Sequence, residues 1–239
     1  MISLGGKTAV VTGAGRGIGR AVAGLLIREG VNILAFSRTR SALEILQAEE
    51  DAGPGRCAVC PGDVTSEDDV RRAFEEASAF GTPDILVNAA GLALFGPLGR
   101  CSFKDWNELI GANLTGTFLM CREAVRTMGS QGHIVNIGSL AGFTPFTNSA
   151  AYCASKYGLV GFTRALSMEL RAEGREGLRV TLIHPGSTDT GLWDGQNWSP
   201  PAHDMLRADD VAGAVLYALK QPPNASVDEM RLLPVKGIL

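Results

Sequence analysis

The feature that most constrains the fold is a glycine-rich turn between a strand-like and a helix-like segment. The turn, residues 12–19, reads Thr-Gly-Ala-Gly-Arg-Gly-Ile-Gly, and a β-rich run at 8–12 leads into it. Apolar residues at helical spacing follow over 18–29. Backbone N–H groups at the start of a helix can hold a phosphate, and glycine allows a close approach. The pattern predicts a dinucleotide-binding turn, with a purely structural tight turn as the alternative.

Strand-like and helix-like segments alternate along the rest of the chain. Further strands are expected at 32–36, 57–60, 85–88, 133–137, 179–184 and 230–234, and further helices at 41–50, 66–78, 103–128, 150–173 and 209–220. Continuously apolar strands separated by helices indicate a parallel sheet covered on both faces. We therefore predict an α/β chain in which residues 1–239 form a single Rossmann-fold domain. Its sheet is expected to be doubly wound, mostly parallel and seven-stranded, with helices on both faces.

Charge and hydropathy argue against two classes of protein. The chain has 22 Lys and Arg residues against 25 Asp and Glu residues, a net charge of −3, so no basic face for nucleic acid is expected. No apolar run has the length of a membrane span. The first residues lack a secretory pattern, so a cytoplasmic protein is expected.

Cysteine and histidine positions do not indicate a metal site. Cys57 and Cys60 have a spacing found in redox and zinc sites, but they fall in an expected strand. Residues three apart on a strand point to opposite faces and cannot share a metal. Buried structural thiols are therefore expected. The histidines show no ligand spacing either: they are His133, His184 and His203.

The end of the second expected strand bears on the choice of dinucleotide. An NAD-binding protein places a carboxylate there, about 20 residues on, to bind the ribose 2′-hydroxyl. This chain has Ser37-Arg38-Thr39-Arg40 instead. A guanidinium suits a 2′-phosphate, and Arg16 in the glycine turn can add a second charge. NADP(H) is the expected cofactor, unless Arg38 and Arg40 are only solvated loop charges.

Tyr152 and Lys156 lie near the start of the helix expected at 150–173. Their i, i+4 spacing places the phenol and the ammonium on one face. A nearby ammonium favours phenolate and lowers the pKa of a tyrosine, which suits it to acid–base work. Ser139, just after the strand expected at 133–137, can hydrogen-bond the same substrate oxygen. Taken alone, however, a Tyr and Lys pair on a helix is more often ordinary surface.

The motifs together resemble those of the short-chain dehydrogenase/reductase family over essentially the whole chain. They occur in the family's order and spacing: the glycine turn, Asp63-Val64, Asn88-Ala89-Ala90-Gly91, Asn113, Ser139, Tyr152-x-x-x-Lys156 and Pro185-Gly186 followed by Thr190. The resemblance implies an NADP(H)-dependent oxidoreductase that transfers hydride between nicotinamide and a ketone, an aldehyde or a secondary alcohol. Two alternatives remain: a 3-oxoacyl-[acyl-carrier-protein] reductase, and a catalytically silent cofactor-binding scaffold.

The resemblance also implies residue roles. Tyr152 is expected to be the general acid in reduction and the base in oxidation, and Ser139 to polarise the carbonyl. Lys156 is expected to bind the nicotinamide ribose and lower the pKa of Tyr152. Asn113 is expected to hold a water in a proton relay. The cofactor is expected to contact the following residues: Gly13, Gly15, Arg16, Gly17, Ile18, Gly19, Ser37, Arg38, Asp63, Val64, Asn88, Ala89, Ala90, Gly91, Tyr152, Lys156, Pro185, Gly186, Thr188 and Thr190.

Substrate binding and assembly complete the expectations. Apolar residues in the loops suggest an apolar pocket for a small molecule: Leu94, Phe95, Phe143, Pro145, Phe146 and Trp193. The irregular segment at about 191–207 is expected to act as a lid. The resemblance implies a homotetramer or homodimer formed through the helices expected at 103–128 and 150–173.

Overall fold

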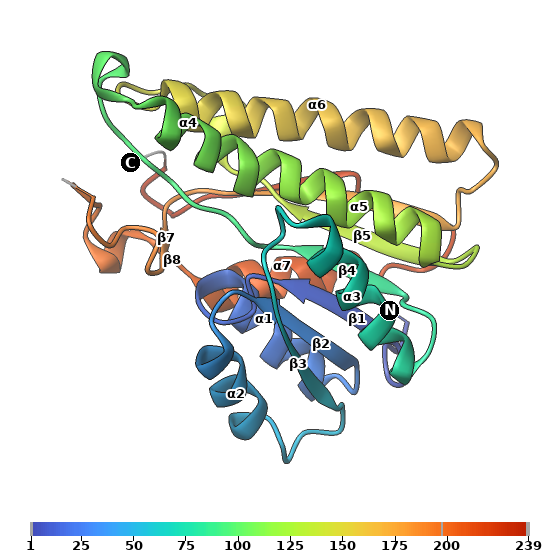
Figure 1. Ribbon diagram of the computed structural model, residues 1–239. Coiled ribbons are helices and arrows are strands. Elements are labelled where there is room, and N and C mark those ends of the chain that lie inside the picture. The colour runs from blue at the N-terminus through green and yellow to red at the C-terminus, as the bar shows by residue number, and fades with distance from the viewer. Residues whose placement is uncertain (1, 197, 238–239) are drawn as a thin grey trace.

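Seven parallel strands form the centre of the molecule (Figure 1). The computed structural model describes residues 2–196 and 198–237. The strand order is β3-β2-β1-β4-β5-β6-β9, and every neighbouring pair is parallel. This is the doubly wound order expected from the alternation of segments. The strands are β1 (Thr8–Thr12), β2 (Asn32–Ser37), β3 (Cys57–Pro61), β4 (Ile85–Asn88), β5 (Gly132–Ile137), β6 (Leu178–Pro185) and β9 (Glu229–Leu232).

Helices cover both faces of the sheet, as the sequence predicts. One face carries α1 (Gly17–Arg28), α2 (Arg40–Glu49) and α7 (Ala208–Leu219). The other carries α3 (Glu67–Ala77), α5 (Gly116–Thr127) and α6 (Ala150–Ala172), with α4 (Phe103–Ile110) leading into α5. Ser66 caps α3, because its hydroxyl accepts a hydrogen bond from the Asp69 N–H.

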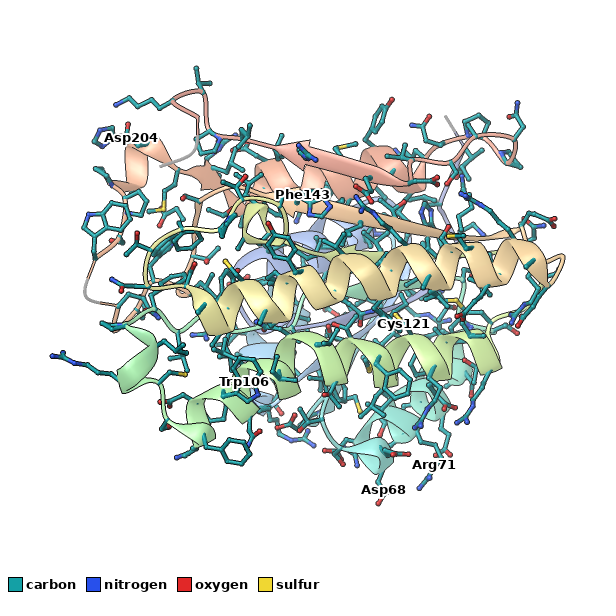
Figure 2. All side chains as sticks on the ribbon, turned by 90° about the horizontal axis from the view of Figure 1, so that it is seen from above. Asp68, Arg71, Trp106, Cys121, Phe143 and Asp204 are labelled. Carbon is teal, nitrogen blue, oxygen red and sulfur yellow. The ribbon has the colours of Figure 1, made fainter. Side chains whose placement is uncertain are left out.

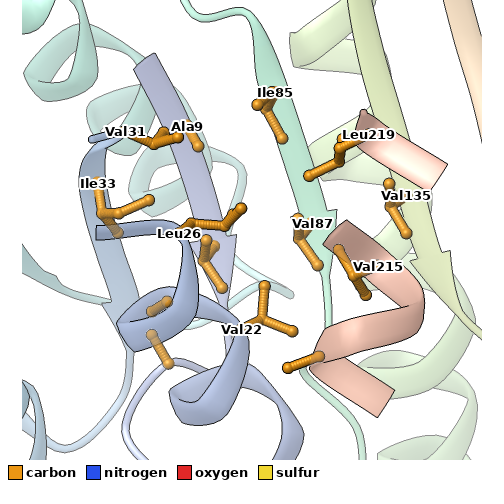
Figure 3. Close-up of a cluster of buried hydrophobic side chains, with 14 of the residues drawn as sticks. Ala9, Val22, Leu26, Val31, Ile33, Ile85, Val87, Val135, Val215 and Leu219 are labelled. Atoms are coloured by element: carbon orange, nitrogen blue, oxygen red, sulfur yellow. The ribbon is translucent and has the colours of Figure 1, made fainter. Parts of the chain in front are cut away.

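Alternation along the strands divides the core into two layers. Ala9 and Val11 face α1 and α7, where they meet a cluster that includes Val22, Leu26 and Val215 (Figure 3). The intervening residue, Val10, faces the opposite layer with side chains of α3 and α5. Both faces of β1 are thus buried, which is why the strand reads as a continuous apolar run.

The long helix expected at 103–128 is interrupted. A π-helical turn, Gly111–Thr115, separates α4 from α5, and the three segments form one continuous helix. Figure 2 looks down on this layer and shows α4, with Trp106, and α5, with Cys121, alongside α6. A π turn adds one residue to the helical repeat and is common at functional sites. Its position brings Asn113 into the interior.

A small second sheet brings together the chain just before the segment expected to act as a lid, about 191–207, and the end of that segment. There β7 (Thr188–Asp189) pairs in parallel with β8 (Leu206–Arg207). A 3₁₀ turn, Ala202–Asp204, lies between them. This sheet is absent from the sequence prediction, because two-residue strands leave no periodic pattern. Residue 197 of the expected lid lies outside the described residues.

The expected strand position of Cys57 and Cys60 is confirmed. Both lie on β3 as free thiols, and burial raises the pKa of each to about 11. Within residues 2–196 and 198–237, no three His, Cys, Asp or Glu side chains are grouped closely enough to hold a metal ion. Over the same ranges, no helix has the length and apolar character needed to cross a membrane.

Candidate active site

The strand order reverses between β1 and β4, and the glycine turn lies at this point. Gly13 has a φ of +67°, and a Cβ there would lie 2.9 Å from the Ala89 carbonyl oxygen and from the Ala90 nitrogen. A Cβ on Gly19 would lie 2.4 Å from the Gly13 carbonyl oxygen. Glycine at these positions therefore lets α1 begin directly against the segment after β4.

Two adjoining cavities open at this point. The larger, of about 1110 Å³, is lined by residues predicted to contact the adenosine half of a cofactor: Gly13, Gly15, Arg16, Ser37, Arg38, Asp63 and Val64. The smaller, of about 570 Å³, is lined by Ser139 and by eight further predicted contacts: Ile18, Ala89, Tyr152, Lys156, Pro185, Gly186, Thr188 and Thr190. Ala90 and Gly91 line both cavities. The geometry thus brings most of the predicted residues to one continuous cleft.

Positive charge gathers at the larger cavity. Arg16 and Arg38 are exposed there, and neither forms an ion pair with a described residue. Arg40, by contrast, pairs with Glu44 at 3.6 Å. The Ser37 hydroxyl is buried and has no hydrogen-bond partner among the described residues. A hydroxyl without a partner beside two unpaired guanidinium groups fits a phosphate group.

The predicted catalytic side chains converge in the smaller cavity. Tyr152 and Lys156 lie one turn apart on α6 and are both buried. The Lys156 ammonium donates a hydrogen bond to the Ile137 carbonyl oxygen at 3.2 Å, and its Nζ is 5.8 Å from the centre of the Tyr152 ring. Ser139 follows β5 directly, and its hydroxyl accepts a hydrogen bond from the Ala141 N–H at 3.1 Å. The carboxyl end of β5 and the first turns of α6 thus meet in the smaller cavity.

Burial is the main cause of the pKa shifts of Tyr152 and Lys156. It raises the pKa of the Tyr152 phenol above its usual value, while the Ser139 hydroxyl hydrogen bond opposes the shift. Burial also lowers the pKa of the Lys156 ammonium to about 8. The predicted lowering of the Tyr152 pKa is therefore not found in the protein alone, because removal from water disfavours the phenolate.

Asn113 lies beneath the cleft. Its amide oxygen accepts a hydrogen bond from the Leu92 N–H at 2.9 Å, and its amide nitrogen donates to the Leu92 carbonyl at 2.9 Å and to the Ser155 hydroxyl at 3.0 Å. The side chain thus ties the segment after β4 to α6. Both amide N–H groups are used in these bonds, whereas the amide oxygen accepts one bond and has a second lone pair. The expected part of Asn113 in a proton relay stays a prediction.

Three other predicted contacts also lie away from the cavity lining. Asn88 is turned into the sheet, where its amide donates to Asn136 at 2.8 Å. Gly17 and Gly19 shape the start of α1 instead of lining either cavity. These positions are required for backbone approach and strand packing, which a motif cannot separate from ligand contact.

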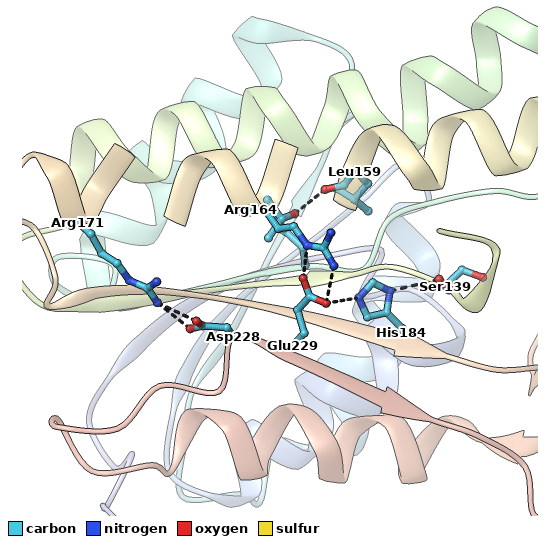
Figure 4. Close-up of polar contacts among 9 residues, drawn as sticks. Ser139, Leu159, Arg164, Arg171, His184, Asp228 and Glu229 are labelled. Atoms are coloured by element: carbon cyan, nitrogen blue, oxygen red, sulfur yellow. Dashed lines mark hydrogen bonds and ion pairs between the residues drawn. The ribbon is translucent and has the colours of Figure 1, made fainter. Parts of the chain in front are cut away.

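A polar chain behind Ser139 was not predicted from the sequence (Figure 4). The His184 Nδ1 lies 3.2 Å from the Ser139 carbonyl oxygen, and its Nε2 lies 3.9 Å from a Glu229 carboxylate oxygen. Arg164 on α6 donates to both oxygens of that carboxylate. Burial lowers the pKa of His184 to about 4, so the neutral ring donates from Nδ1. The ring thus bonds the Ser139 backbone, while its Nε2 has no hydrogen-bond partner among the described residues. Arg164 separately ties Glu229 of β9 to α6.

The expected apolar pocket is formed by half of its predicted residues. Phe95, Phe146 and Trp193 line the smaller cavity. Phe143 instead packs against His184, with ring centres 4.3 Å apart. The other two predicted pocket residues are also absent from the described lining: Leu94 and Pro145.

Comparison with known proteins bears on the whole chain. The model of the family described as short chain dehydrogenase matches residues 7–199. An uncharacterised oxidoreductase of Staphylococcus aureus (strain USA300) is 36% identical over 240 residues, which cover 98% of this chain and 100% of that protein.

Solved structures agree with these sequence matches. A short chain dehydrogenase from Burkholderia cenocepacia J2315, in complex with NADP, is 32% identical with a TM-score of 0.86, and the match covers 99% of both chains. A metagenomic short-chain oxidoreductase, also in complex with NADP, is 33% identical with a TM-score of 0.83, over 98% of this chain and 99% of that one. Taken with the cleft and its side chains, these matches show that the chain belongs to the short-chain dehydrogenase family of oxidoreductases.

Proposed function

We propose that the chain is an NADP(H)-dependent reductase of ketones or aldehydes, acting reversibly on the secondary or primary alcohol. One observation carries the proposal: Ser139, Tyr152 and Lys156 meet in an apolar cavity that adjoins a cleft edged by Arg16 and Arg38. The Burkholderia and metagenomic relatives, which are complexes with NADP, support the choice of cofactor. We propose that a single domain holds both cofactor and substrate.

The proposed roles follow from the chemistry of each group. When bound, NADPH supplies a hydride to the carbonyl carbon. Tyr152 is the general acid: its raised pKa keeps the phenol protonated at neutral pH, ready to give a proton to the carbonyl oxygen. The Ser139 hydroxyl donates a second hydrogen bond to that oxygen as negative charge develops. Lys156 holds the nicotinamide ribose hydroxyls.

The cofactor contacts are proposed on the same basis. The residues that line the larger cavity hold the adenosine half, with Arg16, Ser37 and Arg38 on the 2′-phosphate and Asp63-Val64 at the adenine. The lining of the smaller cavity from Pro185 to Thr190 holds the nicotinamide half. A cytoplasmic location is proposed as well.

Substitution of Tyr152 tests the reaction. Tyr152→Phe removes the proton donor and keeps the ring, so NADPH oxidation over a panel of carbonyl compounds should fall by about a thousandfold or more. Cofactor affinity, measured by NADPH fluorescence, should change little. Tyr217→Phe, at an exposed position on α7, is the matched control. Turnover retained in Tyr152→Phe would exclude the proposed mechanism. An acetoacetyl thioester is included in the panel because its reduction tests the alternative of a 3-oxoacyl-[acyl-carrier-protein] reductase.

Substitution of Arg38 tests the cofactor. Arg38→Ala should weaken NADPH binding roughly ten- to hundredfold and leave NADH nearly unchanged, because only NADPH carries the 2′-phosphate. Arg40→Ala is the matched control, since that side chain is paired with Glu44. Fluorescence titration gives the dissociation constants of NADPH and NADH for both variants. Equal losses for both cofactors would contradict the assignment.

A further inference from the structure

Part of the lining of the smaller cavity, next to Tyr152, is aromatic. Phe95 lies at its centre, with its ring edge-on to that of Tyr152 at 5.4 Å and 85°. The Phe95 ring centre is 5.6 Å from Phe146 and 5.8 Å from Trp193. We call Phe95, Phe146 and Trp193 the aromatic wall. It comes from three separate loops that meet beside the Tyr152 phenol.

Hydrogen bonds hold this wall in place. The Trp193 indole N–H donates to the Thr188 carbonyl oxygen at 2.9 Å. The Gly96 N–H, next to Phe95, donates to the Asn148 carbonyl oxygen at 2.8 Å. These bonds hold the Trp193 indole and the backbone beside Phe95 before any ligand arrives, which lowers the entropy cost of binding. The indole N–H is used within the protein, so Trp193 offers a ligand mainly its ring.

Charge is scarce in this cavity. Lys156 is the only charged side chain among the described lining residues, and it is buried and bonded to the Ile137 carbonyl. A carboxylate or phosphate on the substrate would have no cation available for pairing. Burial of an unpaired charge in an apolar cavity is strongly unfavourable.

We propose that the substrate is an uncharged ketone or aldehyde that carries an aromatic ring near its carbonyl group. The carbonyl oxygen meets Ser139 and Tyr152, and the ring packs against the aromatic wall. Aromatic rings favour tilted or edge-on contacts at ring-centre distances of about 4.5–7 Å, the range already present within the wall. This assignment rests on the proposed function and narrows its substrate class.

Two ketones of matched size and a third that carries a charge test the proposal with wild-type protein and NADPH. Phenylacetone and cyclohexylacetone share the same carbonyl environment and differ in the ring. The third is phenylacetone with a para-carboxylate. We expect kcat/KM for phenylacetone to exceed that for cyclohexylacetone about tenfold. The carboxylate should lower kcat/KM about a hundredfold or more.

Substitution of Phe95 tests whether the aromatic wall causes this preference for an aromatic substrate. Phe95→Leu should reduce the preference for phenylacetone over cyclohexylacetone to about twofold or less. Phe80→Leu makes the same exchange far from the cavity, where Phe80 packs under Arg56 at 4.8 Å, and should retain the full preference. An unchanged preference in Phe95→Leu would overturn the role of the wall.

Binding measured without turnover separates this inference from the proposed function. Phenylacetone should quench tryptophan fluorescence through Trp193 and Trp198, which both line the cavity, and Trp193→Phe should reduce that quenching. Quenching without reduction of any carbonyl would support the ligand class and contradict the reductase function. Turnover of cyclohexylacetone or the carboxylate at least equal to that of phenylacetone would overturn the ligand class and leave the reductase function standing. Neither quenching nor turnover would overturn both.

Discussion

Lys156 is a cation in a position that disfavours charge. It is buried, it has one hydrogen-bond acceptor in Ile137, and burial lowers its pKa to about 8. The unfolded chain binds this proton more tightly, with an ordinary pKa of 10.5. The ammonium therefore costs folding free energy at every pH below about 8, and the cost fades as the pH rises toward 10.5. Buried side chains with shifted pKa values are common at functional sites, where the chemical role of the side chain outweighs its cost in stability.

Replacement of this lysine should make the protein more stable and inactive. Lys156→Met removes the buried charge, so the free energy of unfolding at neutral pH should rise by about 2 kcal/mol. The gain should shrink at about pH 10, where wild-type Lys156 is already neutral in the folded state. Urea unfolding of both proteins at neutral pH and at about pH 10 measures this difference in the free energy of unfolding. Lys104→Met, on an exposed side chain, should leave stability unchanged, and a gain independent of pH would contradict the explanation.

Individual site residues differ in how far the sequence could identify them. The spacing of Tyr152 and Lys156 predicts that they share one helical face, because that relation is local to one helix, but only the family resemblance singled them out as site residues. His184 was not predictable, since its partners Ser139 and Glu229 lie 45 residues away on each side. Contacts of this kind come from strand register, which a single sequence does not reveal.

Whole elements were predicted more fully than their irregularities. The inner strands of the main sheet follow largely apolar runs, and burial on both faces of a parallel sheet requires such runs. The edge strand β9, Glu-Met-Arg-Leu, is an exception and is only partly buried. The π turn Gly111–Thr115 was missed because its backbone shift leaves the apolar pattern of the surrounding helix intact. The β7–β8 pair was missed because such short strands have no measurable period.

The segment from Thr188 to Arg207 is joined to the opposite side of the cavity. The Gln196 amide donates a hydrogen bond to the Ala93 carbonyl oxygen at 2.9 Å, across a sequence separation of 103 residues. This bond positions the aromatic residues of the segment over the site. It lies near the surface and contributes little to the core.

Loss of this bond should affect binding more than folding. Gln196→Ala is expected to raise KM for the carbonyl substrate about fivefold, which corresponds to one ordinary hydrogen bond, with Tm nearly unchanged. Gln221→Ala removes a similar amide bond at the end of α7, to the Tyr217 carbonyl, and should leave KM unaffected. A fall in Tm of Gln196→Ala without a change in KM would show that the bond is purely structural.

At the scale of the whole molecule, the outer face of α5 and α6 has no covering layer among residues 2–196 and 198–237. Phe118 on α5 and Tyr157 and Met168 on α6 are exposed on the side of these helices away from the sheet. Phe118 also packs edge-on against Phe162 of α6 at 6.3 Å, which joins the two helices into one apolar surface. We propose that this face forms the interface of a homodimer or homotetramer.

Light scattering coupled to size exclusion tests the assembly. Wild-type protein should run as a dimer or tetramer, and Phe118→Glu should dissociate it, because an unpaired charge at the centre of an interface is costly. Ile45→Glu, at an exposed position on α2 on the opposite face of the sheet, should leave the assembly intact. A monomeric wild-type protein would contradict the proposed interface.

The two cavities of the cleft share only Ala90, Gly91 and Leu92 among the described residues. The side chains at the ends of β2 and β3 border one cavity, and the loops around Phe95 and Trp193 border the other. Nucleotide preference and substrate range can therefore be redesigned separately, each by substitutions in its own set of loops. Changes made in the two sets should combine with nearly additive effects, because the altered groups have no contact in common.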